Sequence, residues 1–321
     1  MEVTLAAGNL PEWVPIRFYL DNDGYFVDWC RIGPERFTQP FFEATIDARL
    51  RHPFNLLFRH QTPIDYVGEF FDQSPGLKPT GFIFHTSRCG STLLSQMLAS
   101  VERNVVISEP PPIDSVLRAK DAQRRDGLDQ RVLWLKWMVS AIGQKRNASE
   151  ENLFIKFDSW STLSLDIVRR AFPDVPWVFL YRDPVEVIVS QMSQRGAHMV
   201  PGLIPEVLPN IDPDELHSMQ HEEFCARVLG RICRAALQNA GDRKGLFVNY
   251  SQLPDAVAGA ISEHFGVKFL PSELEQIGLK ARYNAKSPQL DFETDSVKKK
   301  YAASWEVRNA ASRWVEQAYN E

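Results

Sequence analysis

Residues 82–98 read Phe-Ile-Phe-His-Thr-Ser-Arg-Cys-Gly-Ser-Thr-Leu-Leu-Ser-Gln-Met-Leu, and this stretch decides the fold. Its apolar beginning predicts a buried strand, Gly90 predicts a tight turn, and the residues from Ser91 onward predict a helix. A helix start presents unpaired backbone N–H groups and the positive end of a dipole, so this junction is suited to bind an anion. It lacks the Gly-Lys-Ser/Thr ending of an ATP or GTP phosphate loop, and Arg88 stands two residues before Gly90 instead.

Apolar runs alternate with helical patterns on both sides of this junction and far beyond it. The predicted strands are Gly81–Phe84, Val105–Ser108, Leu153–Phe157, Trp177–Tyr181 and Leu246–Asn249. The predicted helices are Ser91–Val101, Arg131–Gly143, Leu163–Phe172, Pro184–Gln194, Asp255–Phe265 and Pro213–Ala240, the last either continuous or broken near its start. Repeated strand–helix units predict an α/β fold, a three-layer sandwich with a central parallel sheet. The irregular stretch Arg195–Asp212 is either a binding loop or a structural excursion.

The first 78 residues have a different pattern. Two alternating runs flank Asp21-Asn-Asp-Gly24, which predicts a β-hairpin, and Phe37 to Leu50 has helical spacing. We therefore divide the chain into a small N-terminal α+β extension, residues 1–78, and a main α/β domain, residues 79–321. The extension is expected to pack on the main domain as a cap, and a lid over bound ligands is the alternative.

The composition of the 321 residues is that of an ordinary globular protein, with 44% hydrophobic and 24% charged residues. A net charge of −5 argues against a nucleic-acid or polyanion binder. The four cysteines lack zinc-site spacing and predict free thiols in a reducing cytoplasm. The start does not read as a signal peptide, and no apolar run approaches the roughly 20 residues that a membrane span needs.

A second motif lies about 90 residues after Gly90, in Val178-Phe-Leu-Tyr-Arg-Asp-Pro-Val-Glu-Val-Ile-Val-Ser190. A strand ends at Tyr181, Arg182 follows it, and Asp183 and Pro184 start a helix. Ser190 comes about two helical turns later, on the same side as Arg182. Guanidinium and hydroxyl groups at the carboxyl end of a strand are suited to phosphate recognition.

The two motifs together resemble the PAPS-dependent sulfotransferases, soluble and of bacterial type, where PAPS is 3′-phosphoadenosine 5′-phosphosulfate. Leu246–Leu253 and the helix after it resemble a later part of that family, so the resemblance runs from Gly81 to about Val267. It implies a P-loop-like fold and transfer of a sulfuryl group from PAPS to a hydroxyl or amine of a small-molecule acceptor. The alternatives are a P-loop kinase-like phosphotransferase and a non-catalytic nucleotide-binding protein.

The resemblance also implies roles for individual residues. The implied cofactor-binding residues are Arg88, Cys89, Gly90, Ser91, Thr92, Leu93, Arg182, Ser190 and Tyr250. Arg88 is similar in position to the family's phosphosulfate-loop lysine, and Lys156 matches a catalytic lysine. Soluble eukaryotic members have a histidine base where this chain has Asp158, and bacterial members have a glutamate base at a position similar to Glu109. We expect Glu109 to be the base, with Asp158 as the second candidate.

Several other residues carry weaker expectations. Many family members have Trp where Leu93 stands, so adenine stacking is expected from Tyr250 or Phe265. His198, in the irregular stretch, is expected to touch the acceptor, and His85 to be a satisfied strand-end histidine. The Lys298–Lys300 run corresponds to a mobile basic loop of the family. His217 and His221 have zinc-compatible spacing without a third ligand, so no metal site is predicted.

Overall fold

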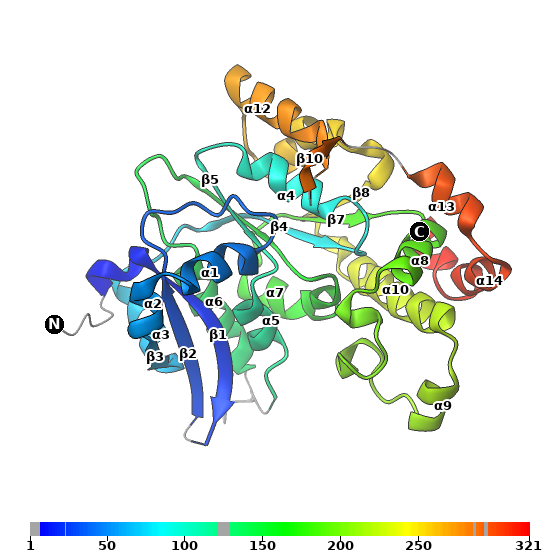
Figure 1. Ribbon diagram of the computed structural model, residues 1–321, viewed down its shortest axis with the longest axis horizontal. Coiled ribbons are helices and arrows are strands. Elements are labelled where there is room, and N and C mark those ends of the chain that lie inside the picture. Colours follow the sequence, from blue (N-terminus) through cyan, green and yellow to red (C-terminus); the bar gives the residue numbers. More distant parts are fainter. Residues whose placement is uncertain (1–6, 23, 121–128, 285–286, 292–294) are drawn as a thin grey trace.

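A five-stranded parallel sheet lies at the centre of the computed structural model, which describes residues 7–22, 24–120, 129–284, 287–291 and 295–321 (Figure 1). Its strands are β4 (Pro79–His85), β5 (Asn104–Ser108), β6 (Asn152–Lys156), β7 (Trp177–Tyr181) and β8 (Gly245–Asn249). The order across the sheet is β5-β6-β4-β7-β8, and each neighbouring pair is parallel. All five strands expected from the sequence are present.

Helices cover both faces of this sheet because its side chains alternate between two cores. Phe82 and Phe84 of β4 belong to one hydrophobic cluster, and Ile83 between them belongs to the other. The Ile83 face is covered by α4 (Ser91–Ala99), η7 (Val257–Ile261) and α12 (Pro271–Ala281), and α11 (Ser262–His264) directly follows η7. The opposite face is covered by α6 (Gln130–Ile142), α7 (Leu165–Ala171), α8 (Pro184–Ser193) and α10 (His221–Gln238). The predicted three-layer α/β sandwich is confirmed.

The N-terminal part forms a separate antiparallel sheet with short helices. The elements are η1 (Ala7–Glu12), β1 (Trp13–Asp21), β2 (Gly24–Arg31), α1 (Phe42–Leu50), α2 (Pro53–Leu57), β3 (His60–Pro63) and α3 (Ile64–Gln73). Asp21 pairs with Gly24, which confirms the hairpin. The helix expected from Phe37 begins only at Phe42, because Pro40 has no N–H to donate and Phe41 is extended.

The N-terminal sheet packs directly against α6. Phe18 of β1 lies 5.5 Å from the Trp134 ring, and Tyr25 of β2 lies 4.5 Å from the same ring, measured between centroids. Trp13, Phe18 and Val27 belong to the same buried cluster as Phe84 of the central sheet. The N-terminal sheet and one face of the central sheet therefore share one hydrophobic core.

One helix was not expected from the sequence. A helix, α5 (Pro111–Leu117), follows Glu109, because Pro111 sits in a first turn where its missing N–H costs nothing. The helix expected over Pro213–Ala240 is broken near its start, into α9 (Pro213–Ser218) and α10, with extended residues between them. The remaining elements are η2 (Ser159–Ser164), η3 (Ala197–Met199), η4 (Pro205–Val207), η5 (Ala240–Asp242), η6 (Tyr250–Gln252), β9 (Tyr283–Asn284), β10 (Ser287–Asp291), α13 (Ser296–Ala302), α14 (Trp305–Trp314) and α15 (Glu316–Asn320). No helix within the described ranges is both long enough and apolar enough to cross a bilayer.

Candidate functional site

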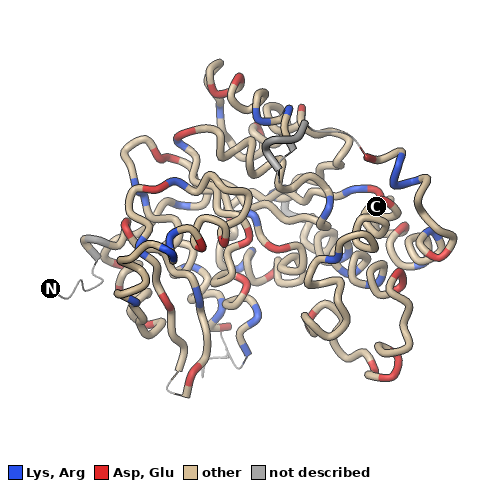
Figure 2. Tube along the Cα trace, viewed as in Figure 1, with Lys and Arg blue, Asp and Glu red and all other residues tan. Residues whose placement is uncertain are grey.

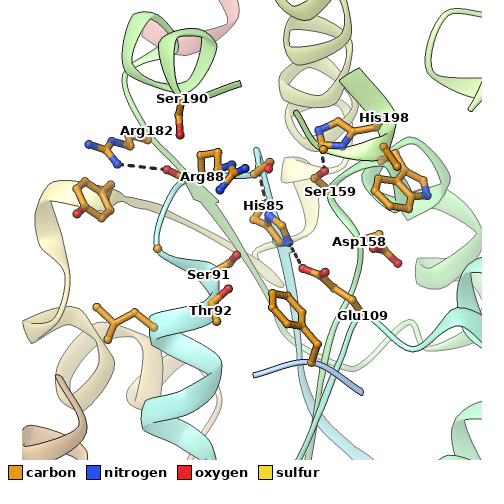
Figure 3. A pocket seen from close by; sticks show the side chains of 18 of the residues that line it. His85, Arg88, Ser91, Thr92, Glu109, Asp158, Ser159, Arg182, Ser190 and His198 are labelled. Atoms are coloured by element: carbon orange, nitrogen blue, oxygen red, sulfur yellow. Dashed lines mark hydrogen bonds and ion pairs between the residues drawn. The ribbon is translucent and has the colours of Figure 1, made fainter. Parts of the chain in front are cut away.

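A cavity of about 460 Å³ lies at the carboxyl edge of the central sheet (Figure 3). Parallel strands end at one edge, so the residues after β4, β5, β6 and β7 meet there. The structure brings most of the predicted site residues to this cavity: Arg88, Gly90, Ser91, Thr92, Leu93, Glu109, Asp158, Arg182, Ser190, His198 and Tyr250 all line it. Lys156 and Cys89 do not line it, and both are fully buried.

The loop between β4 and α4 has an unusual backbone. Ser87, Arg88 and Gly90 are left-handed, with φ of 66°, 52° and 84°. Such backbone in a non-glycine residue costs about 1–3 kcal/mol and often marks a functional site. Gly90 is the N-cap of α4, and no side chain caps this helix. A Cβ on Gly90 would lie 2.8 Å from Leu253 Cδ1 and 3.1 Å from the Tyr250 ring. The helix start is thus open to an anion, and only glycine fits at its entrance.

Two side chains of this loop point away from the helix start. The Arg88 guanidinium donates through Nη2 to the Gln194 carbonyl oxygen, 2.6 Å away, at the end of α8. Cys89 is fully buried, and its Sγ lies 3.3 Å from the Leu180 carbonyl oxygen. Arg88 therefore ties the loop to α8, and the Cys89 thiol points into the core rather than into the cavity.

The carboxylate of Glu109 is paired with two groups of the central sheet. Its Oε1 lies 2.8 Å from Lys156 Nζ and 3.4 Å from His85 Nε2. His85 Nδ1 accepts a hydrogen bond from the Ser87 N–H at 2.9 Å, which leaves Nε2 to carry a proton toward Glu109. Burial raises the pKa of Glu109, but the charge of Lys156 and the hydrogen bond from His85 outweigh it and hold that pKa well below its usual range. Glu109 is therefore a firmly ionised carboxylate.

Asp158 has the opposite electrostatic environment. It lies two residues after the end of β6, is partly buried, and lines the cavity close to Glu109 (Figure 3). Burial, and then the negative charges of Glu109 and Asp114, raise the pKa of Asp158 well above its usual value. Two carboxylates on adjacent strand ends thus have pKa values pushed in opposite directions, which is typical of acid–base sites.

Arg182 lies at the end of β7 and is almost fully buried, with 5% of its side chain exposed. Its Nε donates to Glu186 at 2.6 Å, and its Nη1 donates to the Arg88 carbonyl oxygen at 3.3 Å. The Tyr250 ring lies 4.1 Å from the guanidinium carbon, a cation–π contact. The two sequence motifs, far apart in the chain, are therefore in direct contact, and Ser190 faces the same cavity from α8.

The cavity also has walls that the sequence analysis missed. Phe41, from the N-terminal extension, lies with its ring 5.0 Å from Lys156 Nζ. Trp160 donates from its indole N–H to Asp114 at 2.6 Å. Phe41 belongs to no motif, so nothing in the sequence pointed to it. Ser159 and Trp160 directly follow Asp158, and their position after a strand end was a usable signal.

His198, expected to touch the acceptor, lines the cavity beside Trp160. Its Nε2 lies 3.2 Å from the Ser159 hydroxyl, and its ring is 5.3 Å from the Trp160 ring. Burial lowers the pKa of His198 to about 3, so the imidazole is neutral at physiological pH. His198 can therefore exchange hydrogen bonds but carries no charge into the cavity.

The weaker expectations have mixed outcomes. Phe265 packs against Phe154 in the core and does not line the cavity, whereas Tyr250 does. The lysine run expected in a loop lies on α13, where Lys299 lines the cavity. His217 and His221 lie on different helices. Within the described residues, no group of three or more His, Cys, Asp or Glu residues is arranged to hold a metal ion.

Comparisons with known proteins give matches only at the level of solved structures. No family model and no curated protein matches the chain. The sulfotransferase domain from the curacin biosynthetic pathway is 18% identical, with a TM-score of 0.42 over 74% of this chain and 97% of that one. The sulfotransferase domain of the Synechococcus PCC 7002 olefin synthase is 18% identical, with a TM-score of 0.41 over 75% and 88%. Mouse sulfotransferase SULT7A1 complexed with PAP is 11% identical, with a TM-score of 0.40 over 80% and 88%. The solved structures named here are sulfotransferases, and none of these similarities assigns a role to a residue of this chain.

Proposed function

We propose that this chain is a PAPS-dependent sulfotransferase that transfers a sulfuryl group to a hydroxyl, or an amine, of a small-molecule acceptor and releases adenosine 3′,5′-bisphosphate. One observation carries the proposal. The open helix start at Gly90 and the strand-end Arg182 line the same cavity as the carboxylates Glu109 and Asp158. An anion site, a second cationic site and a proton acceptor are the groups that sulfuryl transfer to a hydroxyl needs.

The residues at one end of the cavity fit the nucleotide. Backbone N–H groups of Ser91, Thr92 and Leu93 have no helical partners and would hold the 5′-phosphosulfate. Gly90 has a left-handed φ at this helix start, and a Cβ there would collide with Leu253. Arg182 and Ser190 would hold the 3′-phosphate, with Tyr250 beside them. PAPS, when bound, supplies the activated sulfuryl group and a phosphate leaving group.

The other end of the cavity would hold the acceptor and receive its proton. A general base works best when its pKa lies near the working pH. The pKa of Asp158 is raised toward that range, whereas the pKa of Glu109 is held far below it. We therefore assign Asp158 as the base. Glu109 keeps Lys156 and His85 in place and raises the proton affinity of Asp158 through its negative charge.

Binding and turnover separate the proposal from its rivals. Isothermal titration calorimetry with adenosine 3′,5′-bisphosphate should show binding that is tighter than that of ATP. A preference for ATP would favour the P-loop kinase and overturn the proposal. A screen of phenol, alcohol and amine acceptors with PAPS, read by mass spectrometry for a sulfated product, separates an enzyme from a protein that only binds nucleotide.

Replacing Arg182 by Ala tests the site of the 3′-phosphate. The variant should bind adenosine 3′,5′-bisphosphate more weakly by about one to two orders of magnitude, because a buried charge-assisted contact is lost. Its affinity for AMP, which lacks the 3′-phosphate, should change much less. Equal weakening toward both nucleotides would show that Arg182 shapes the loop rather than reading the 3′-phosphate.

A further inference from the structure

The guanidinium of Arg182 is occupied by a carboxylate from outside its own strand and helix. Its Nη2 donates to Asp295 Oδ1 at 2.6 Å and to the Ser296 hydroxyl at 3.1 Å. Asp295 lies just before α13, more than 100 residues away in the sequence, and it lines the same cavity. Its side chain is 43% exposed, whereas that of Glu186, the other carboxylate on Arg182, is 5% exposed. Glu186 is thus a fixed partner, and Asp295 is a partner at the cavity surface.

Asp295 bridges two cations as a ligand anion would. One of its oxygens binds Arg182, and the other lies 2.6 Å from Lys299 Nζ on α13. Lys299 also lines the cavity. An oxyanion with two oxygens held between a guanidinium and an ammonium is the arrangement by which proteins bind phosphate groups.

Within the described residues, the cations around Asp295 are already paired with carboxylates, so none of them is free to bind an additional anion. Lys300 pairs with Asp183 at 2.9 Å and lies 3.6 Å from Glu186. Arg182, Lys299 and Lys300 thus face three carboxylates, and Figure 2 shows the basic positions of α13 beside acidic ones. A phosphate that joined this group with Asp295 in place would meet uncompensated negative charge, which is costly at a buried site.

We propose that Asp295 is an internal competitor for the nucleotide 3′-phosphate: it occupies Arg182 and Lys299 in the free protein, and the 3′-phosphate replaces it. The inference rests on the proposed function. Its consequence is selectivity. A nucleotide without a 3′-phosphate leaves Asp295 where it is. A nucleotide with a 3′-phosphate must displace Asp295 and then forms contacts with both Arg182 and Lys299. Asp295 thus sets how tightly the product and the donor bind, without touching the reacting atoms.

The test compares two nucleotides by calorimetry on the full chain. Asp295→Ala should bind adenosine 3′,5′-bisphosphate about three- to tenfold more tightly than the unmodified protein, because a partly exposed competing ion pair is gone. AMP affinity should stay within about twofold, since AMP does not reach Arg182. Asp295→Asn, which keeps an oxygen acceptor without the charge, should fall between the two. Glu215→Ala is the control, because it removes an exposed carboxylate paired with Arg227 on another part of the chain.

A double variant checks that the effect acts through Arg182. In an Arg182→Ala background, Asp295→Ala should lose most of its effect on the bisphosphate, because the competed group is absent. Unchanged or weaker bisphosphate binding in Asp295→Ala alone would overturn the inference and make Asp295 a positioning partner of Arg182. Equal tightening toward AMP would overturn it as well. Failure of the unmodified protein and of the variant to bind the bisphosphate would overturn the proposed function, and this inference with it.

Discussion

Lys156, the last residue of β6, and Glu109, which directly follows β5, are joined twice. The Glu109 backbone N–H donates to the Lys156 carbonyl oxygen at 2.7 Å, and the side chains form an ion pair at 2.8 Å. The Lys156 side chain has no exposed surface, and Glu109 has a left-handed φ of 54°. The pairing holds Glu109, whose backbone is strained, at the edge of the cavity. Among the described residues, Glu109 is the only carboxylate that forms an ion pair with Lys156.

The first prediction concerns stability. Glu109→Gln leaves the buried ammonium of Lys156 unpaired, so the free energy of unfolding should fall by about 3–5 kcal/mol. Urea denaturation at pH 7 measures it. The double variant Glu109→Gln with Lys156→Met should lose less than Glu109→Gln alone, because it leaves no buried charge. A double variant that is less stable than the single one would show that the pair matters for more than charge balance.

The same pair predicts a pH dependence of stability. The pKa of Glu109 is lower in the folded protein than in the unfolded chain. Its contribution is therefore complete above the ordinary glutamate pKa of 4.5 and is lost as pH falls below it. Unfolding curves between pH 7 and about pH 3 should show that the unmodified protein loses more stability than Glu109→Gln. Parallel losses in both proteins would contradict the depressed pKa.

The third prediction concerns the base. Asp158→Asn keeps the size of the side chain but cannot accept a proton, so kcat should fall by about two to four orders of magnitude. The affinity for adenosine 3′,5′-bisphosphate should be nearly unchanged, since Asp158 lies at the acceptor end of the cavity. Asp166→Asn, an exposed position in the first turn of α7, is the matched control. Near-normal kcat in Asp158→Asn would return the role of base to Glu109.

Glu109 should also shift the pH profile of the reaction. The raised pKa of Asp158 means that kcat/KM falls as pH drops through that pKa, because a protonated carboxylate is no base. Removing the Glu109 charge removes the second-largest cause of that rise, so the acidic limb should move to lower pH in Glu109→Gln. Asp114→Asn should move it in the same direction, by less. An acidic limb at the same pH in all three proteins would mean that another group controls it.

The last prediction concerns the loop before α4. Gly90→Ala should destabilise the protein by about 1–2 kcal/mol through its left-handed φ, and should also weaken nucleotide binding. Gly266→Ala is the control, because Gly266 has φ of 68° and a Cβ added there would meet no other atom within 4 Å. The control should show the loss of stability in thermal unfolding without the loss of binding. Similar binding by both variants would remove the loop from the proposed nucleotide site.

Much of the architecture could be predicted because it follows from local patterns. The five strands are short apolar runs that end in polar residues, and the two motifs stand at strand–helix junctions, where topology brings them together. The helix after Glu109 was missed because it begins within three consecutive prolines, which lack the N–H that a helix interior needs, although proline is well tolerated in a first turn.

The contacts within the site could not be predicted because they depend on distant segments. Nothing in the neighbourhood of Arg182 indicates that Asp295 reaches it, since the two residues belong to different elements. The choice between Glu109 and Asp158 depends on which of them lies against Lys156, and that is decided by the register of β5 and β6. The two candidate bases look alike in sequence and differ only in their electrostatic surroundings.

Phe41 gives the N-terminal extension a part in the cavity, although the extension adds no strand to the central sheet. One wall of the cavity, beside Lys156, therefore belongs to a segment that lies outside both sequence motifs. Substitutions around Phe41 reshape one end of the cavity while Gly90 and Arg182 keep the other end constant. Directed evolution of residues near Phe41 is therefore a route to a changed cavity wall that leaves the residues of both motifs in place.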